Sequence, residues 1–495
     1  MNIAHALTGG MGWRSLAFEP ADGEKGVKPP LTPEAPIKSW AANPSFIVRL
    51  LILVTVIFFL VHETVAWSYG YAISESEDGF YICGAAGLNY RWSYGLLIKI
   101  DKNGNELWNK TYEGIYRSQI WRCLKSEDGL FLGGVTGFND DAWIAKVDFD
   151  GNMSWQKVYG YGSDADSASC ISEDLRGVLG FLTIAPCQNV SKNANTFNLN
   201  CPNVDTWILH LDEKGNELWV KKIDFRDYDS IKSAKKVRDG YIAAGVVGDF
   251  LGDRFGNYDI WVLKIDEMGN VVWSKFFNLG YDEFAWDVIE FEEGYVVVGS
   301  ALNIDLSKIG LQRVEGNESE NLTVQASHGF ALKLDSSGNL EWVRFFDDGL
   351  LSTAWSAFDY KNKLVIAGAG MDKSGSFIWF RALDGYGENV WLKTYRNNFN
   401  FFLPYSGPVQ ALKVEDGYLV VGSVGSVFSS SCPWVGKFNK DGEIIWERAY
   451  CLSENQHNFR FANQDSKDQE NFIGIIAFGT IFLLLVAYLI KKNKI

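Results

Sequence analysis

The stretch DKNGNELWNK, from Asp101 to Lys110, contains a pattern that occurs seven times in this chain of 495 residues. An Asp is followed three residues later by a Gly and four residues after that by a Trp, with one copy that begins with Asn. The copies begin at Asp101, Asp148, Asp212, Asp266, Asp335, Asp384 and Asn439. The internal spacing is constant, although successive copies start 47 to 69 residues apart. A fixed pattern at variable intervals indicates one supersecondary unit repeated with variable connections.

Each copy is surrounded by four predicted strands, which we call A, B, C and D. Examples are 285–292 for strand A, 293–300 for B, 259–266 for C and 216–223 for D. Runs of β-branched and aromatic residues bounded by Gly and Asp are typical of strands. Seven such units predict an all-β fold, a seven-bladed β-propeller of four-stranded antiparallel blades that spans residues 67–450.

The repeated residues have separate physical roles in this prediction. The Asp caps backbone amides of the C–D turn, and the Gly adopts a positive φ. The Trp, which lies inside strand D, is expected to dock against the neighbouring blade. A basic residue follows each Trp two positions later and can cover the indole ring. The tryptophans predicted to dock the blades are Trp108, Trp155, Trp219, Trp273, Trp342, Trp391 and Trp446.

The units DGFYICGAAG…LLIKIDKNGNELWNKTY and RDGYIAAGVVG…DIWVLKIDEMGNVVWSKFF resemble the repeats of archaeal cell-surface β-propeller proteins. The resemblance covers about residues 67–450 and implies a fold but no activity. A more distant similarity is to the quinoprotein propeller repeat, in which an Asp, a Thr-Gly turn and a Trp dock the blades. The Thr is absent here and the Asp-to-Gly distance is one residue shorter, so quinone binding is not expected.

An apolar segment that begins at Phe472 and ends at Ile490 contains no charged residue and is followed by KKNK. Its length and basic flank predict a transmembrane helix over 472–490, a cytoplasmic tail at 491–495 and a propeller on the outer side of the cell membrane. A buried core helix is the alternative. The predicted protein therefore crosses the membrane once, with residues 451–471 as the linker.

The amino-terminal part of the chain contains a shorter apolar run, 50–61, preceded by Arg49. The segment 45–66 is therefore predicted to be a signal peptide, with a retained membrane anchor as the alternative. Residues 1–44 lack periodicity, so they are expected to be a disordered extension or to precede the true start of translation.

Composition excludes one class of partner and favours another. The net charge of −15 and the pI of about 4.9 argue against nucleic acid as a partner, because phosphate binding needs clustered Lys and Arg. The expected function is that of a binding or scaffolding ectodomain for a protein or glycan partner, without catalysis. The alternative is a cell-surface hydrolase that acts on glycan or peptide with carboxylates from several blades.

No cofactor and no catalytic residue is predicted. His210 and His328 are the only histidines of the repeat region, and no zinc motif is present. His210 is expected to be structural, because most other blades have a basic residue at its position. One calcium site is a weaker candidate, formed by oxygen-bearing side chains at Asp249, Asp253, Asn257 and Asp259.

The seven cysteines favour an exported chain, because disulfides persist in oxidising compartments. Two disulfides are predicted, one between Cys187 and Cys201 and one between Cys432 and Cys451. The remaining cysteines, Cys83, Cys123 and Cys170, are expected to be small core residues, with at least one unpaired. N-glycosylation sequons occur at Asn109, Asn152, Asn189, Asn317 and Asn321, of which the last three lie in predicted loops.

Long B–C connections in three consecutive units locate the expected binding surface. They cover 185–205, 248–259 and 301–328. In a propeller all B–C and D–A connections open on one face, and loops longer than a connection requires are commonly functional. The candidate contact residues on this face are Phe250, Phe255 and Tyr258.

Overall fold

The computed structural model describes residues 67–89, 92–113, 117–137, 140–160, 166–174, 177–185, 204–250, 255–303, 326–349, 351–372, 374–396, 410–425 and 431–452. These residues belong to one compact unit, Thr64–His457. None of them forms an α-helix, and no helix among them is long and apolar enough to cross a membrane. The segments 1–44, 45–66 and 472–490, with the linker beyond residue 452, lie outside the described residues.

The described strands form seven four-stranded antiparallel units, which we call blades 1 to 7. Five of them are separate sheets, whereas blades 5 and 6 share one eight-stranded sheet. Blade 1 contains β1 (Trp67–Glu75), β2 (Gly79–Asn89), β3 (Trp92–Asp101) and β4 (Glu106–Tyr112), and blade 2 contains β5 (Ser118–Lys125), β6 (Gly129–Thr136), β7 (Asp141–Asp148) and β8 (Met153–Tyr159). Blade 3 contains β9 (Ser167–Asp174), β10 (Gly177–Ile184), β11 (Asp205–Asp212) and β12 (Glu217–Ile223). Blade 4 contains β13 (Tyr228–Val237), β14 (Gly240–Phe250), β15 (Phe255–Ile265) and β16 (Val271–Phe277).

Blade 5 contains β17 (Asp282–Phe291), β18 (Gly294–Asn303), β19 (Ala326–Asp335) and β20 (Leu340–Phe346). Blade 6 contains β21 (Leu351–Asp359), β22 (Leu364–Asp372), β23 (Gly375–Leu383) and β24 (Asn389–Tyr395). Blade 7 contains β25 (Gln410–Val414), β26 (Gly417–Val424), β27 (Cys432–Asn439) and β28 (Ile444–Ala449). A single parallel bridge, Ser327 to Leu351, connects the sheets of blades 5 and 6. The predicted strand order A–B–C–D is therefore present in all seven blades.

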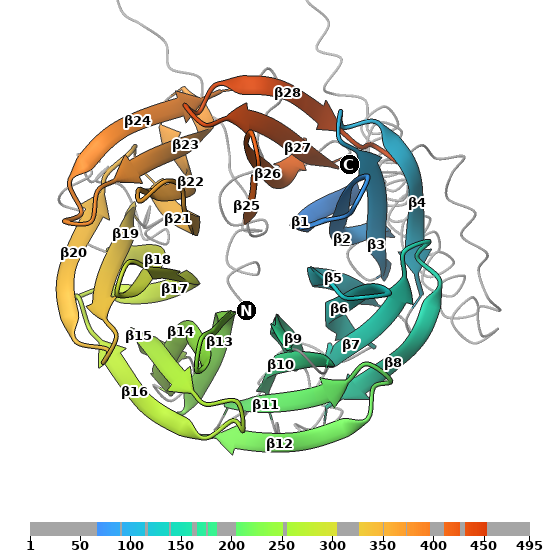
Figure 1. Ribbon diagram of the computed structural model, residues 1–495, viewed down its shortest axis with the longest axis horizontal. Coiled ribbons are helices and arrows are strands. Elements are labelled where there is room, and N and C mark those ends of the chain that lie inside the picture. Colours follow the sequence, from blue (N-terminus) through green and yellow to red (C-terminus); the bar gives the residue numbers. More distant parts are fainter. Residues whose placement is uncertain are drawn as a thin grey trace, which may run out of the picture. The chain divides into compact units, whose positions relative to one another are not determined.

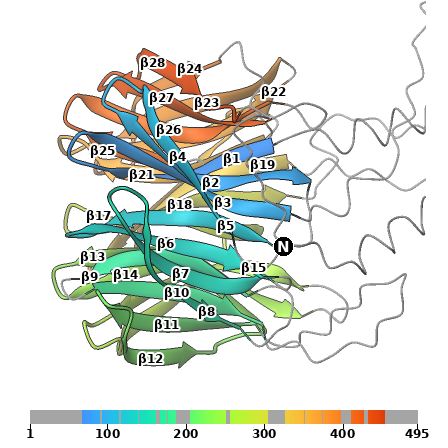
Figure 2. The same cartoon turned by 90° about the vertical axis from the view of Figure 1, so that its right-hand side faces the viewer.

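The blades are arranged in a ring, with the A strands toward the centre and the D strands at the rim (Figure 1). Figure 2 shows the same strands from the side, running between two faces. Because the strands alternate in direction, the A–B and C–D turns share one face. The B–C and D–A connections share the other, which we call the B–C face. Central strands such as β6 and β10 are buried along their whole length, as their continuous apolar sequences require.

The C–D turn has the chemistry that its sequence predicts. In blade 1, Oδ1 of Asp101 accepts hydrogen bonds of 2.8 Å from the backbone N–H groups of Asn103 and Asn105. The Asn105 side chain also donates to Oδ2 of Asp101 at 2.8 Å. These donors hold the pKa of the Asp101 carboxyl below its ordinary value, chiefly through the Asn105 side chain. Gly104 closes the turn with φ +81°, in the left-handed region that a side chain resists.

Six of the seven repeated Trp rings lie directly over the Gly of the next blade's C–D turn, whereas at Gly442 the side chain of Lys393 is nearer than the ring of Trp391. A Cβ built on Gly269 of blade 4 would be 2.5 Å from the ring of Trp219 in blade 3. The same contact continues from blade 7 to blade 1, where a Cβ on Gly104 would be 2.7 Å from Trp446. Only glycine therefore fits under the indole at these turns.

Polar contacts also connect the end of one blade to the C–D turn of the next blade. The Nε1 group of Trp155 donates to the Glu213 carbonyl at 2.9 Å, and the Tyr450 hydroxyl donates to the Gly104 carbonyl at 2.9 Å. Lys110 lies 5.6 Å from the Trp108 ring centroid, and its Nζ donates to Asn152 Oδ1 at 2.8 Å. The basic residue after the Trp thus binds both its own ring and the neighbouring turn.

The cysteines differ in part from the sequence prediction. The Cys432–Cys451 disulfide is present within blade 7. Cys83 and Cys123, expected as separate core residues, instead form a disulfide that connects β2 of blade 1 with β5 of blade 2. The sequence could not show this pair, because the contact exists only after two blades have packed together. Cys170 is free and buried, and Cys187 and Cys201 lie outside the described residues.

Trp273→Ala tests the docking role of the indole. For a fully buried Trp the expected cost is about 3–5 kcal/mol. Trp273 is only half-buried, however, so we expect the free energy of unfolding to fall by about 2 kcal/mol. Chemical denaturation of the full chain measures this value. An unchanged midpoint of unfolding would contradict docking.

Gly269→Ala tests the same contact from the other side. Its φ of +75° costs about 1–2 kcal/mol for an L residue, and the new methyl group meets Trp219. Gly280→Ala is the matched control, because Gly280 has φ +92° but no atom within 4 Å of its built Cβ. Gly269→Ala should therefore be the more destabilising of the two in thermal unfolding, and equal effects would show that the indole contact adds nothing.

Candidate functional site

A polar pocket with a volume of about 610 Å³ opens at the junction of blades 4 and 5. Its residues come from the D–A corner before β13, the β14–β15 hairpin, the D–A corner before β17 and the end of β18. All four segments lie on the B–C face. The lining residues are Arg226, Asp249, Asn257, Asp259, Asn278, Gly280, Tyr281, Asp282 and Leu302.

Arg226 organises the carboxylates on one side of this pocket. Its Nη1 group donates to Oδ2 of Asp259 at 2.5 Å, and its Nε lies 3.5 Å from Oδ1 of Asp249. Asn278 donates from Nδ2 to the other Asp259 oxygen at 2.7 Å. Asp259 is buried and held by both partners, whereas the side chain of Asp249 is 39% exposed. This side of the pocket thus contains one fixed carboxylate, Asp259, and one that solvent reaches, Asp249.

The segment 248–259, predicted as a loop, is mostly strand. β14 continues to Phe250 and β15 begins at Phe255, with Asp249 opposite Gly256 across a register shift. Polar residues such as Asn257 concealed this extension in the sequence, because they interrupt the apolar pattern that predicts strands. Asn257 adopts φ +52°, which Asn tolerates better than most residues.

The corner before β17 is held by a buried carboxyl group. Oε1 of Glu283 accepts hydrogen bonds from the backbone N–H groups of Leu279 at 3.0 Å and Tyr281 at 2.8 Å. Burial raises the pKa of Glu283 to about 7, and the charges of Asp259 and Asp282 contribute to the rise. Glu283 has no exposed surface, so its role is to position the pocket wall.

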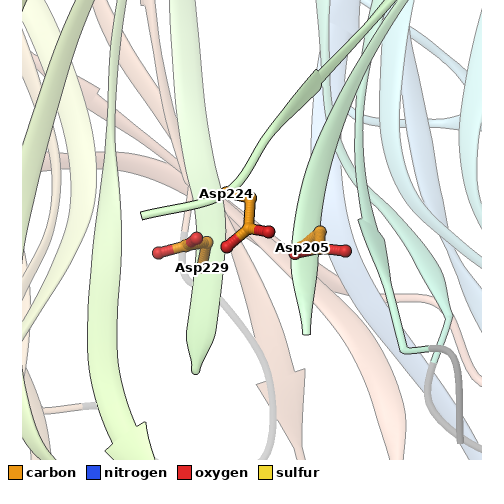
Figure 3. Close-up of side chains that lie close together, drawn as sticks. All are labelled: Asp205, Asp224 and Asp229. Carbon is orange, nitrogen blue, oxygen red and sulfur yellow. The ribbon is translucent and has the colours of Figure 1, made fainter. Parts of the chain in front are cut away.

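A buried carboxyl group also holds the corner before β13. Asp229 accepts hydrogen bonds from the backbone N–H groups of Phe225 at 2.6 Å and Arg226 at 3.2 Å. Burial raises the pKa of Asp229 to about 6. Oxygens of Asp205, Asp224 and Asp229 lie within 4.8 Å of one another at this junction of blades 3 and 4 (Figure 3).

The structure brings together three of the four predicted calcium candidates. Asp249, Asn257 and Asp259 all line the pocket, and Asp253 lies outside the described residues. Arg226 provides a positive charge next to both aspartates. Calcium binding at this place therefore remains a prediction that would have to overcome the guanidinium.

The three aromatic residues predicted to contact a partner are Phe250, Phe255 and Tyr258, and only the side chain of Tyr258 is described. Phe250 and Phe255 pair with each other across the β14–β15 hairpin, and only their backbone is described. Tyr258 is half-buried, with its ring 4.9 Å from Phe284 and 5.8 Å from Tyr228. Its backbone N–H donates to Asp282 Oδ1 at 3.1 Å, so Tyr258 supports the pocket wall.

The two histidines have partners with ordinary structural roles. His210 is fully buried and its Nε2 lies 3.1 Å from Oδ1 of Asp174. The lysine at the equivalent place in blade 4, Lys264, binds Asp239 at 2.6 Å. His210 thus occupies the position of a blade-internal cation, as its place in the repeat predicts. His328 contacts Asp347 through Nδ1. The sequons Asn189, Asn317 and Asn321 lie outside the described residues.

Sequence reasoning missed Arg226, Asn278, Asp282 and Glu283. A signal was present, because Asp224 and Asp229 have the same five-residue spacing as Asn278 and Glu283 after consecutive D strands. Aligning the D–A corners as well as the C–D turns would have revealed it.

No protein-family model matches this chain, and no curated protein matches it. Solved structures with similar strand arrangements include a protein of unknown function from Bacteroides caccae, with 13% identity, a TM-score of 0.39 and coverage of 67% of this chain and 96% of that one. Cobalt-substituted apocarotenoid oxygenase from Synechocystis has 11% identity, a TM-score of 0.43 and coverage of 79% and 95%. These all-β likenesses are too distant to support any statement about activity.

The raised pKa of Glu283 predicts a pH-dependent stability. Between its ordinary value of 4.5 and about 7, the folded chain binds more protons than the unfolded chain. The contribution of Glu283 to stability is therefore complete below about pH 4.5 and is lost as the pH rises through about 7. Glu283→Gln should reduce this fall in thermal unfolding, with the smaller contribution of Asp229 retained. Glu290→Gln, an exposed change in the same strand, is the control. An identical pH profile in both variants would contradict the assignment.

Proposed function

We propose that the chain is a membrane-anchored, extracytoplasmic binding or scaffolding protein built on a closed seven-bladed β-propeller. Closure is supported by contacts between the first and last blades, where the backbone N–H of Ser68 donates to the Ser431 carbonyl at 2.8 Å. Trp446 over Gly104 adds the same contact that connects the other blades. The repeat resemblance to archaeal cell-surface propellers agrees with this proposal.

Export and anchoring rest on chemistry from two parts of the chain. Disulfides between Cys83 and Cys123 and between Cys432 and Cys451 favour an oxidising compartment. The uncharged segment 472–490 with its basic flank supports a single membrane crossing with the blades outside.

The pocket between blades 4 and 5 is the observation that carries the binding function. Concave sites with a few converging polar groups are the usual places for ligands. Asp249 and Asp282 provide acceptors, Arg226 and Asn278 provide donors, and Tyr281 offers an aromatic ring beside them. This mixture suits the hydroxyl groups of a glycan or a polar side chain of a protein partner.

The charge of the pocket narrows the class of ligand. Asp249, Asp259 and Asp282 contribute three carboxylates against the single guanidinium of Arg226. An anionic ligand would be repelled, whereas a neutral or positively charged group would be attracted. We therefore favour a neutral or amine-bearing glycan, or a basic segment of a protein.

A surface hydrolase is the second candidate, and one feature favours it. The pKa of Glu283 is raised and the carboxyl group of Asp259 is nearby, and acid–base catalysis uses such pairs of carboxyl groups. Complete burial of Glu283 and its two backbone hydrogen bonds weigh against this reading. Asp229 has the same arrangement at the previous corner, which supports a structural function for both.

Asp249→Ala tests the binding proposal. The side chain is partly exposed at the pocket and its loss leaves Asp259 bound to Arg226, so the fold should persist. We expect binding of the purified full chain to its strongest neutral or basic ligand on glycan and peptide arrays to weaken about tenfold, as for the loss of a charged hydrogen bond.

Asp150→Asn removes an exposed carboxylate on a C–D turn and is the control for charge alone. If Asp249→Ala and the control bind the ligand equally well, the pocket is not the ligand-binding site. Turnover of an array ligand by the full chain would replace the binding proposal with the hydrolase.

A further inference from the structure

A cluster of three carboxyl groups at the junction of blades 3 and 4 is separate from the pocket described above. Asp205 begins β11, Asp224 follows β12 and Asp229 is in β13. Figure 3 shows the carboxyl groups of Asp224 and Asp229 side by side, with Asp205 beyond them on the neighbouring strand. One ligand oxygen from each residue lies within 4.8 Å of the others.

The buried oxygens of this cluster are incompletely satisfied. Asp205 is 1% exposed, and its Oδ1 has no hydrogen-bond partner anywhere in the described part of the chain. A buried carboxylate oxygen without a donor is costly, unless a cation or a donor is supplied. This oxygen is the independent sign that the cluster takes a ligand.

One positive charge, that of Lys222, already lies at the cluster. Lys222 Nζ lies 2.7 Å from Oδ2 of Asp205 and 3.8 Å from Oδ2 of Asp224, while the lysine side chain is 50% exposed. The ammonium group reaches solvent, so Lys222 can leave Asp205 when another cation takes its place. Lys222 therefore marks a place where a cation is favourable, without filling it permanently.

The equivalent positions at the junction of blades 4 and 5 carry less negative charge. There Asp259, Asn278 and Glu283 occupy the places of Asp205, Asp224 and Asp229. The amide of Asn278 replaces one carboxylate, and Arg226 binds Asp259 at 2.5 Å. At the junction of blades 3 and 4, Asp224 takes the place of Asn278, so all three acidic residues are retained there, with Lys222 next to Asp205 and Asp224.

We propose that Asp205, Asp224 and Asp229 bind a divalent cation of the oxygen-preferring class, with Ca²⁺ as the ion to test first. Carboxylate oxygens from three separate segments are the ligands that such ions select. Binding would connect strand C of blade 3 to strand A of blade 4, next to the wall of the polar pocket that Arg226 and Asp229 share. The proposal does not depend on the ligand of that pocket.

Thermal unfolding and isothermal titration of the full chain with Ca²⁺, against chelator, test the site. Ca²⁺ should raise the melting temperature of the wild type and of the control Asp150→Asn, since an ion that binds only the folded chain stabilises it. Asp224→Asn removes an exposed ligand and should weaken Ca²⁺ binding about tenfold or more. Lys222→Met removes the competing ammonium and should strengthen it.

The opposite results would overturn the proposal. A wild type that Ca²⁺ neither stabilises nor binds would exclude the site. So would equal Ca²⁺ affinity in the wild type and Asp224→Asn. If Asp224→Asn does not fold, the Ca²⁺ affinity of Lys222→Met decides alone. A Ca²⁺ affinity unchanged by the loss of the Lys222 ammonium group would then show a simple ion-pair network and overturn the proposal.

Discussion

The contact between an indole and the glycine of the next blade is the constraint on which the structure depends. The indole needs a flat, side-chain-free surface, and the αL glycine of the C–D turn provides it. The Asp before that glycine fixes the turn through backbone N–H groups, so the surface is already formed when the indole arrives. One short pattern therefore specifies both a turn within a blade and the position of the next blade.

Regular docking on the C–D side leaves the opposite face open to variation. The C–D turns all keep the same spacing from their first residue to the Gly, whereas the B–C connections differ in length from blade to blade. The polar pocket and the carboxyl cluster are both on this variable face, at consecutive junctions. Each is built from strand C of one blade and the corner that leads into the next, so their geometry follows from the same blade packing.

The sequence predicted the strands and turns well because their signals are local. Asp101 and Gly104 act within five residues, and the apolar run of β10 has a single reading. The pocket was less accessible, because Arg226 meets Asp249 and Asp259 only through the pairing of two long strands. The Cys83–Cys123 disulfide was missed for the same reason, since it forms between blades.

The central claim is that the indole–glycine contact closes the ring between blade 7 and blade 1. A double-mutant cycle of Trp446→Ala and Gly104→Ala, measured as free energies of unfolding, tests it most directly. If the ring is closed as described, Gly104→Ala should be less destabilising by about 1 kcal/mol when Trp446 has been removed, because the clash is gone. Strictly additive effects would mean that the two ends of the repeat array do not touch, and would contradict the account.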